Sequence, residues 1–392
     1  MNWIDTYFKG DRTIWLVVMF LSVFSILAVY SSTGTLAYKY QSGNTEYYLF
    51  KHFVILLFGF GLMYFSHIVR YTFYARLSKI GLFITVPLLI LTLASGTNLN
   101  EASRWLTLPV VNLSFQTSDL AKLSLILYVA RILSKKQDEI KGFRTAFVPV
   151  MLPVIIVCML ILPANFSTAA VLFATCLVLM FIGRINLKYI FSLLGIAIAA
   201  FGLFILIAYL TGYQGRINTW KARIENFNNG SSDGNYQVEQ AKIAIATGGI
   251  IGKGPGNSSQ RNFLPHPYSD FIFAIIIEEY GLIGGMLVVL FYILLFYRAI
   301  RIVRKTERAF AALITIGCAF SLVFQAMINM AVAVNLFPVT GQPLPMLSMG
   351  GTSIWFTSLA LGIILSVSAE IEQEEMNRNT GNVNTGGVLA TI

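Results

Sequence analysis

The chain has 392 residues, of which 56% are apolar and only 12% are charged. A soluble domain carries about a quarter charged residues, so this composition excludes an ordinary soluble protein. The formal net charge of +10 would suit a nucleic-acid-binding protein. The positions of the basic residues argue against that class, because they follow the pattern of a membrane protein.

Apolar segments long enough to cross a membrane recur along the chain and predict an all-α polytopic membrane protein. Ten transmembrane helices are expected, at about 13–33, 51–69, 77–95, 118–134, 146–163, 167–183, 187–210, 269–297, 308–334 and 350–370. The expected membrane domain covers 1–370, with one large loop, 211–268, between the seventh and eighth spans. Residues 371–392 are polar and are predicted to form a disordered tail.

The distribution of lysine and arginine predicts the orientation. Segments on the side that includes both termini hold 18 of the 28 basic residues, whereas the short loops on the opposite side hold three. Basic residues are retained on the cytoplasmic side of a membrane. Both termini are therefore predicted to be cytoplasmic and the large loop external, and the positive charge indicates topology and attraction to anionic lipid.

Cysteine and histidine give no sign of a disulfide or a metal site. The three cysteines lie inside apolar runs without CxxC spacing, and His52, His67 and His266 are scattered along the chain. We therefore expect the cysteines to be small buried hydrophobic residues.

Charged residues inside the apolar segments mark the first candidate functional positions. Asp119 and Lys122 stand at i and i+3 at the start of the fourth span, where they can pair on one helix face. A structural ion pair explains them as well as a functional role does. Glu278 and Glu279 lie inside the eighth span, and we expect them to be structural or to line a pathway, with Lys122 a candidate partner for one of them.

Asp270 stands where the large loop meets the eighth span, within LPHPYSDFIFAIIIEEYG at 264–281. Two interpretations are open. Asp is a strong helix N-cap residue, so Asp270 could only cap the span. A carboxylate at the external interface is also suited to act as a general base.

Two further segments break the apolar pattern. The glycine-rich segment 248–261 carries Lys253 and Arg261 and lacks the GxxxxGK[ST] pattern of a phosphate-binding P-loop. It could hold a polyanion, or its glycines could only permit tight turns. The segment 335–353 contains three prolines and three glycines and is uncharged. It predicts a rigid loop that packs against protein or lines a cavity.

Several stretches, in the same order along the chain, resemble the RodA/FtsW/SpoVE (SEDS) family of bacterial wall synthesis. They are RWL at 104–106, QTSDLAKL at 116–123, RIENF at 223–227, YQVEQAKIAIATGGIIGKGPGNS at 236–258, LPHPYSDFIFAIIIEEYGLIG at 264–284 and FPVTGQPLPMLSMGGTS at 337–353. The resemblance covers nearly the whole chain and is closer to FtsW than to RodA. The chain departs from the family pattern at Asn165, where an Asp is usual, and at His266 and Tyr268.

The resemblance implies a peptidoglycan glycosyltransferase of the bacterial cytoplasmic (inner) membrane. Such proteins polymerise lipid II, the undecaprenyl-pyrophosphate-linked disaccharide peptide, on the outer membrane face during cell division or elongation. It implies Asp270 as the catalytic base of an inverting reaction. Positive charge at the pyrophosphate would come from Lys, Arg or a divalent cation such as Mg²⁺ or Mn²⁺. Substrate contacts are expected from Arg104, Lys122, Arg223, Lys253, Ser258, Arg261 and Ser348.

The resemblance also implies a class B penicillin-binding protein as the transpeptidase partner, together with other membrane proteins of the division or elongation machinery, and no nucleic acid. Two rival functions stay open: a lipid II flippase, and a scaffold without enzyme activity. The unusual residues cluster toward the external side, which favours the enzyme, because a flippase needs polar groups along its full depth.

Overall fold

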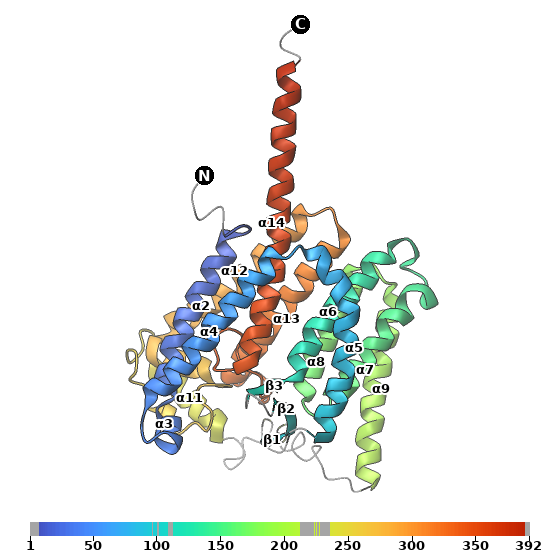
Figure 1. Ribbon diagram of the computed structural model, residues 1–392. Helices are drawn as coiled ribbons and strands as arrows, with labels where there is room; N and C mark the ends of the chain where they lie inside the picture. Colours follow the sequence, from blue (N-terminus) through green and yellow to red (C-terminus); the bar gives the residue numbers. More distant parts are fainter. Residues whose placement is uncertain are drawn as a thin grey trace.

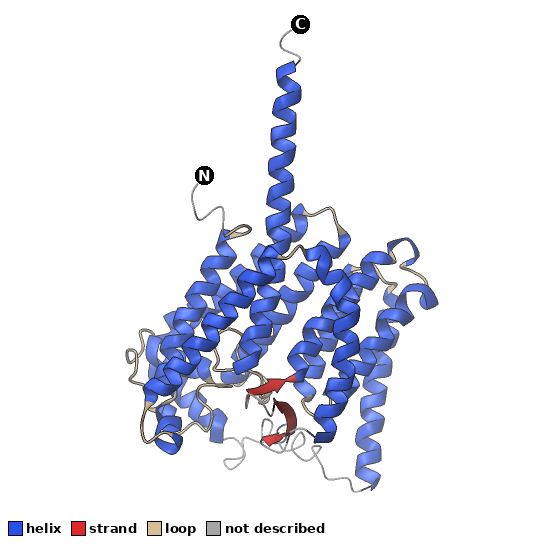
Figure 2. Cartoon of the chain, viewed as in Figure 1, coloured by secondary structure: helices blue, strands red, loops and turns tan. Residues whose placement is uncertain are grey.

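The computed structural model describes residues 8–95, 97–99, 102–108, 113–211, 223, 225, 227 and 236–388, and helices dominate it (Figure 2). The helices are α2 (Arg12–Ser32), α3 (Gly34–Tyr40), α4 (Thr45–Ile68), α5 (Tyr71–Ser95), α6 (Thr117–Lys135), α7 (Val148–Ile161), α8 (Phe166–Ile182), α9 (Leu187–Thr211), α11 (Tyr236–Gly248), α12 (Ile272–Lys305), α13 (Ala309–Ala333) and α14 (Gly351–Val388). Three strands, β1 (Thr97–Leu99), β2 (Ala102–Leu108) and β3 (Leu113–Gln116), lie between α5 and α6.

Seven of the described helices are long and apolar enough to cross a membrane. They are α2, α4, α5, α7 with the π-turn Phe143–Phe147 that precedes it, α12, α13 and α14. α8 and the first part of α9 are shorter apolar helices. α6 is the tenth helix that matches a predicted span, and it carries Asp119, Lys122, Arg131 and Lys135. Every predicted span therefore coincides with a helix, while the crossing of the membrane by all ten stays a prediction.

The protein is mostly helical, as predicted, but between α5 and α6 three strands that the sequence did not predict form an antiparallel sheet in the order β1-β2-β3. Apolar positions pair across it, with Leu106 opposite Phe115 and Leu108 opposite Leu113. Apolar residues directly opposite each other on neighbouring strands stabilise an antiparallel sheet. The sheet lies at the end of the helical bundle opposite to both chain termini, which we call the sheet end (Figure 1).

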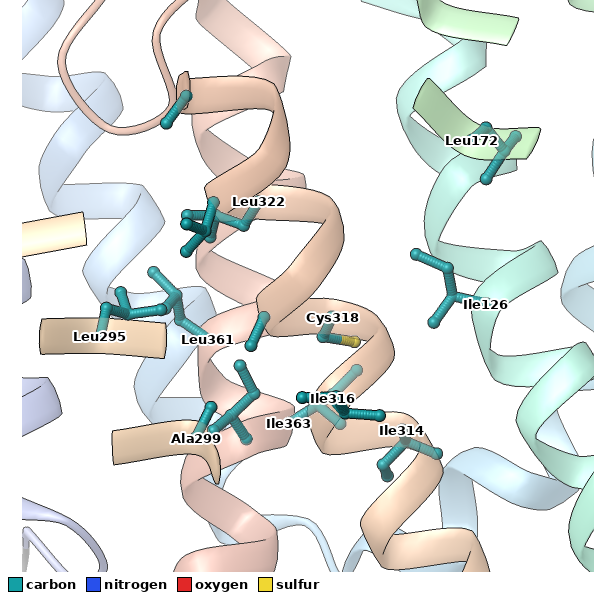
Figure 3. Close-up of a cluster of buried hydrophobic side chains, with 14 of the residues drawn as sticks. Ile126, Leu172, Leu295, Ala299, Ile314, Ile316, Cys318, Leu322, Leu361 and Ile363 are labelled. Atoms are coloured by element: carbon teal, nitrogen blue, oxygen red, sulfur yellow. The ribbon is translucent and has the colours of Figure 1, made fainter. Parts of the chain in front are cut away.

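α13 lies at the centre of the hydrophobic core (Figure 3). Side chains from four other helices surround it, among them Ile126 of α6, Leu172 of α8, Leu295 and Ala299 of α12, and Leu361 and Ile363 of α14. Lipid tails are as apolar as these side chains, so close packing rather than escape from water holds such helices together. The three cysteines are buried and form no disulfide, as expected.

The segment between α13 and α14 turns back into the bundle. The Tyr292 hydroxyl of α12 donates to the carbonyl oxygen of Pro345, and Ser25 of α2 donates to that of Leu347 at 2.8 Å. Irregular backbone at membrane depth requires such partners. The prediction that 335–353 packs against protein is confirmed, and we call 338–350 the re-entrant loop.

α14 continues beyond the bundle to Val388, whereas the sequence predicts a disordered tail from 371 (Figure 1). Ion pairs hold the first part of this segment against the turn between α12 and α13. Arg308 pairs with Glu370 at 3.3 Å and with Glu374 at 2.8 Å. The two glutamates stand one turn apart on the same helix face, so Arg308 can pair with both of them and stabilise the helix there.

Candidate active site

Asp270 lies in a turn just before α12 rather than at the capping position of the helix. The N-cap residue of α12 is Phe271, whose side chain makes no capping hydrogen bond, and Asp270 precedes it by one residue. This position argues against a role for Asp270 as only the helix cap. The residue is half-buried.

The backbone around Asp270 is fixed by two polar side chains from other elements. The amide nitrogen of Asn329, on α13, donates to the carbonyl oxygen of Asp270 at 2.9 Å and to that of Gln342 at 2.7 Å. The hydroxyl of Ser348 donates to the carbonyl oxygen of Ser269 at 2.6 Å. The turn that carries Asp270 is thus joined to α13 and to the re-entrant loop.

Ser348 is buried and already has a hydrogen-bond donor and an acceptor as partners. Besides its bond to Ser269, its hydroxyl accepts the backbone N–H of Leu344 at 2.7 Å. Substrate contact by Ser348 stays a prediction. Its two hydrogen bonds hold the Asp270 turn against the re-entrant loop.

Among the described residues, Ser269 and Arg223 both act on the Asp270 carboxylate. The Ser269 hydroxyl donates to its Oδ1 at 3.0 Å. Arg223, which donates to the carbonyl oxygen of Val339 at 3.0 Å, lies close enough to interact electrostatically with Asp270. Burial lowers the pKa of the Arg223 guanidinium, and the charge of Asp270 acts in the opposite direction. A positive neighbour favours the ionised carboxylate, which is the form that a general base needs.

Lys122 belongs to a second polar group inside the bundle. Its ammonium lies 2.7 Å from Oδ1 of Asp119 and donates to Oε1 of Gln325 at 3.0 Å. The predicted pairing of Asp119 with Lys122 is confirmed. Both line a cavity of about 50 Å³, and the second carboxylate oxygen of Asp119 has no hydrogen-bond partner among the described residues. A cavity of this size holds about three water molecules at ~15 Å³ each.

Gln325 and Asn329 connect the two polar groups, and the sequence analysis did not identify either of them. They stand one turn apart on α13, so their side chains lie on the same helix face. Gln325 binds Lys122, and Asn329 binds the backbone of Asp270. Gln325 also donates to the carbonyl oxygen of Pro343 in the re-entrant loop at 2.9 Å. Amide side chains at this spacing inside an apolar helix were the available signal.

The glycine-rich segment forms a third group, around the two glutamates of α12. The ammonium of Lys253 lies 2.6 Å from Oε1 of Glu278, which is fully buried. The expectation that Lys122 pairs with Glu278 or Glu279 is therefore wrong. A prediction from sequence spacing could not separate the two lysines, because α11 and the glycine-rich segment reach α12 only through the tertiary fold.

Ser258 and Arg261 also bind within the protein. The Ser258 hydroxyl donates to Glu278, and its backbone N–H donates to Glu279 at 3.3 Å. Arg261 donates to the carbonyl oxygen of Ser31 at 3.1 Å. The structure thus engages Lys253, Ser258 and Arg261 in this third group rather than bringing them together with Asp270. The side chain of Arg104, in β2, lies outside the described residues.

Replacing Asn329 with leucine is expected to lower the free energy of unfolding by about 1–3 kcal/mol, because two buried carbonyl groups lose their donor. Leucine preserves the volume, so the loss reports hydrogen bonding. Thermal unfolding of the purified variant measures it. The matched control is Asn262→Leu, at an exposed asparagine outside the core. Equal stability of the two variants would contradict the assigned role.

Comparison with known proteins identifies the family. The sequence profile of the FtsW/RodA/SpoVE family, described as cell cycle proteins, matches residues 11–373. A probable peptidoglycan glycosyltransferase FtsW of Trichlorobacter lovleyi is 32% identical, over 92% of this chain and 94% of the relative. Stage V sporulation protein E of Bacillus subtilis is also 32% identical, over 91% of this chain and 96% of the relative.

Solved structures share the fold. A chain from a study of polymerization and crosslinking by a peptidoglycan synthase complex matches with a TM-score of 0.72 at 23% identity, over 93% of this chain and 99% of that one. Rod shape determining protein RodA of Thermus thermophilus matches with a TM-score of 0.66 at 22% identity, over 93% and 98%. From the profile and the curated relatives, this chain belongs to the FtsW/RodA/SpoVE family of cell cycle proteins.

Proposed function

We propose that this chain polymerises lipid II into glycan strands on the outer face of the bacterial inner membrane, during cell division or elongation. The observation that carries the proposal is the Asp270 carboxylate, half-buried in a fixed turn next to Arg223. The names of the FtsW relatives support a peptidoglycan glycosyltransferase. Their similarity extends over most of the chain, including the segment with Asp270.

In the proposed reaction Asp270 is the general base. It takes the proton from the 4-hydroxyl of the acceptor sugar while that oxygen attacks the anomeric carbon of the donor. A new glycosidic C–O bond forms as the bond to undecaprenyl pyrophosphate breaks, and the pyrophosphate leaves with the electron pair. Attack opposite the leaving group inverts the anomeric configuration. A positioned base of this kind contributes about 10²–10⁴-fold to the rate.

The leaving pyrophosphate needs positive charge rather than an acid. Of the basic residues proposed to provide it, Arg223 lies at Asp270, whereas Lys253 is paired with Glu278. Within the described part of the chain, no three His, Cys, Asp or Glu side chains converge. Mg²⁺ is commonly held by one or two carboxylates together with substrate phosphates, so such an ion would be bound with the pyrophosphate rather than by a cage of protein side chains.

The topology and partners belong to the same proposal. Ten spans with both termini in the cytoplasm would place the sheet end, and with it Asp270, outside. The membrane domain 1–370 would then present its site to lipid II in the outer leaflet. A class B penicillin-binding protein would crosslink the product, which is in keeping with a structural relative described in terms of polymerization and crosslinking.

A lipid II flippase is the second candidate function. The cavity beside Asp119 and Lys122 favours it, because buried charges in a membrane protein often line a substrate pathway. The two functions make different demands. A flippase needs no general base at Asp270, and a polymerase needs no passage through the bundle.

Incubating the purified protein with lipid II, alone and with its candidate transpeptidase, tests the proposal. We expect glycan strands longer than the disaccharide unit, separated by gel electrophoresis. The control is the same reaction without protein. Folded protein that yields no strands under either condition would contradict the glycosyltransferase assignment.

A further inference from the structure

α12 is interrupted at Gly281. This residue has φ 69° and ψ −173°, whereas the helix runs from Ile272 to Lys305. Such backbone angles are accessible essentially only to glycine. The break leaves backbone groups on both sides without helical partners, and in a membrane protein these groups must be satisfied within the protein.

The glycine-rich segment fills this break with backbone hydrogen bonds. Two N–H groups of the segment donate to α12, and two N–H groups of α12 donate back. The pairs are Lys253 to Glu278 at 3.0 Å, Gly254 to Glu279 at 2.9 Å, Leu282 to Gly249 at 2.9 Å and Ile283 to Ile250 at 3.3 Å. The segment therefore supplies hydrogen-bond partners to the backbone of the interrupted helix. We call residues 249–254, bonded in this way to the break in α12, the plug.

The close approach explains the glycine pattern. A Cβ atom on Gly252, which has φ 90°, would lie 2.2 Å from the carbonyl oxygen of Glu279. A Cβ atom on Gly281 would lie 2.2 Å from the carbonyl oxygen of Ile250. Of the two interpretations of this segment, the geometry supports tight turns and close packing.

The carboxylate of Glu278 is surrounded by the same segment. Besides the ion pair with Lys253, it accepts the backbone N–H of Ser259 at 3.1 Å, the Ser259 hydroxyl at 2.9 Å and the N–H of Gln260 at 3.3 Å. Ser258 donates a further hydrogen bond. We call Lys253, Ser258, Ser259 and Glu278 the clasp.

The clasp is connected to Asp270 through α11. This helix leads directly into the glycine-rich segment, and it packs on the start of α12. The contact forms a small hydrophobic core of its own, which contains Val238, Ala241 and Ala244 with Phe271, Ala274 and Ile275. Arg223 belongs to the same long connection as α11. The stretch 270–281 is thus held at one end by Asn329 and at the other by the clasp.

We propose that Lys253 and Glu278 are positioning residues: their ion pair docks α11 and the glycine-rich segment onto α12 and so fixes the stretch 270–281 that begins with Asp270. The inference rests on the proposed function. A fully buried carboxylate is costly unless it is paired and hydrogen-bonded, and Glu278 is both. Loosening the clasp would release α11 and the Gly281 end of this stretch, while the bonds of Asn329 and Ser348 keep the Asp270 turn folded.

The first test is kinetic and uses Lys253→Met and Glu278→Gln, with rates expressed per folded protein. Misplacement of about 1 Å costs up to ~10²-fold in rate, so we expect kcat to fall by about 10–100-fold with KM little changed. Lys253→Arg should restore the parent kcat, because it keeps a positive charge beside Glu278.

The matched control is Glu375→Gln, which breaks an ion pair with Lys305 at the other end of α12, where the side chains are 52% and 49% exposed. It should leave both kcat and KM unchanged. A Lys253→Met protein that folds and keeps the parent kcat would overturn the inference.

A second measurement does not depend on activity. Spin labels on cysteines introduced at Ile243 of α11 and Leu290 of α12, which are 42% and 58% exposed, report the docking directly. We expect one narrow distance distribution in the parent and a broad one in Lys253→Met. Unchanged distances would overturn the docking role. Changed distances in a chain that makes no glycan would leave the clasp standing and contradict the proposed function alone.

Discussion

Asp270→Asn is expected to lower the rate of lipid II polymerisation by about 10²-fold or more, because it removes the general base. Asparagine has nearly the same size, and the Ser269 hydroxyl can still donate to its oxygen. The bonds that fix the turn, from Asn329 and Ser348, go to backbone carbonyl groups and survive the change. The variant should therefore fold like the parent. Initial rates per folded protein measure the effect.

Glu375→Gln, on α14 beside the far end of α12, again provides a control, because it also neutralises one carboxylate. It should keep the parent rate. A twofold change in rate corresponds to only ~0.4 kcal/mol of activation free energy. An Asp270→Asn protein that polymerises within about twofold of the parent rate would remove Asp270 from the mechanism.

Gly281→Ala is expected to lower the free energy of unfolding by about 3 kcal/mol or more. The backbone strain contributes about 1–3 kcal/mol, and forcing a methyl group against the Ile250 carbonyl contributes about as much again. The added Cβ would lie 2.2 Å from that oxygen, and both partners are backbone, so neither can move aside. Thermal unfolding of the detergent-solubilised variant measures the loss.

Comparison with Gly249→Ala separates the cost of backbone strain from the cost of steric crowding by the added methyl group. Gly249 lies in the same segment and also has a positive φ, 57°, but no atom lies within 4 Å of its Cβ position. Its left-handed backbone should cost only about 1–2 kcal/mol. Equal stability losses in the two variants would contradict the plug that the glycine-rich segment forms in α12.

The helices were predictable from the sequence because each apolar segment has the length of a membrane span. The sheet was not, because β1, β2 and β3 are short and their pairing depends on contacts across the chain. Phe115 of β3, for example, packs edge-on against Phe356 of α14 with ring centroids 5.6 Å apart. The helical start of the tail depends in the same way on Arg308, which lies far away in the sequence.

The candidate site was predictable where it depends on local spacing. Asp119 and Lys122 share a helix face, so their ion pair followed from the sequence. The pairing of Lys253 with Glu278 did not follow from the sequence, because it depends on an interruption of α12 that the apolar pattern does not reveal. Gln325 and Asn329 were missed for a different reason: two amides one turn apart in an apolar helix do not indicate which groups they bind. Their role became visible only through the carbonyl groups that they bind.

The central claim is that Asp270 drives polymerisation from the outer membrane face, and one reconstitution measures this most directly. The parent and Asp270→Asn proteins are inserted into vesicles in one orientation, and lipid II is supplied only in the leaflet at the sheet end. We predict glycan strands with the parent and a yield about 10²-fold lower with the variant. Equal yields from the two proteins, or strands formed only when lipid II is supplied in the opposite leaflet, would contradict the account.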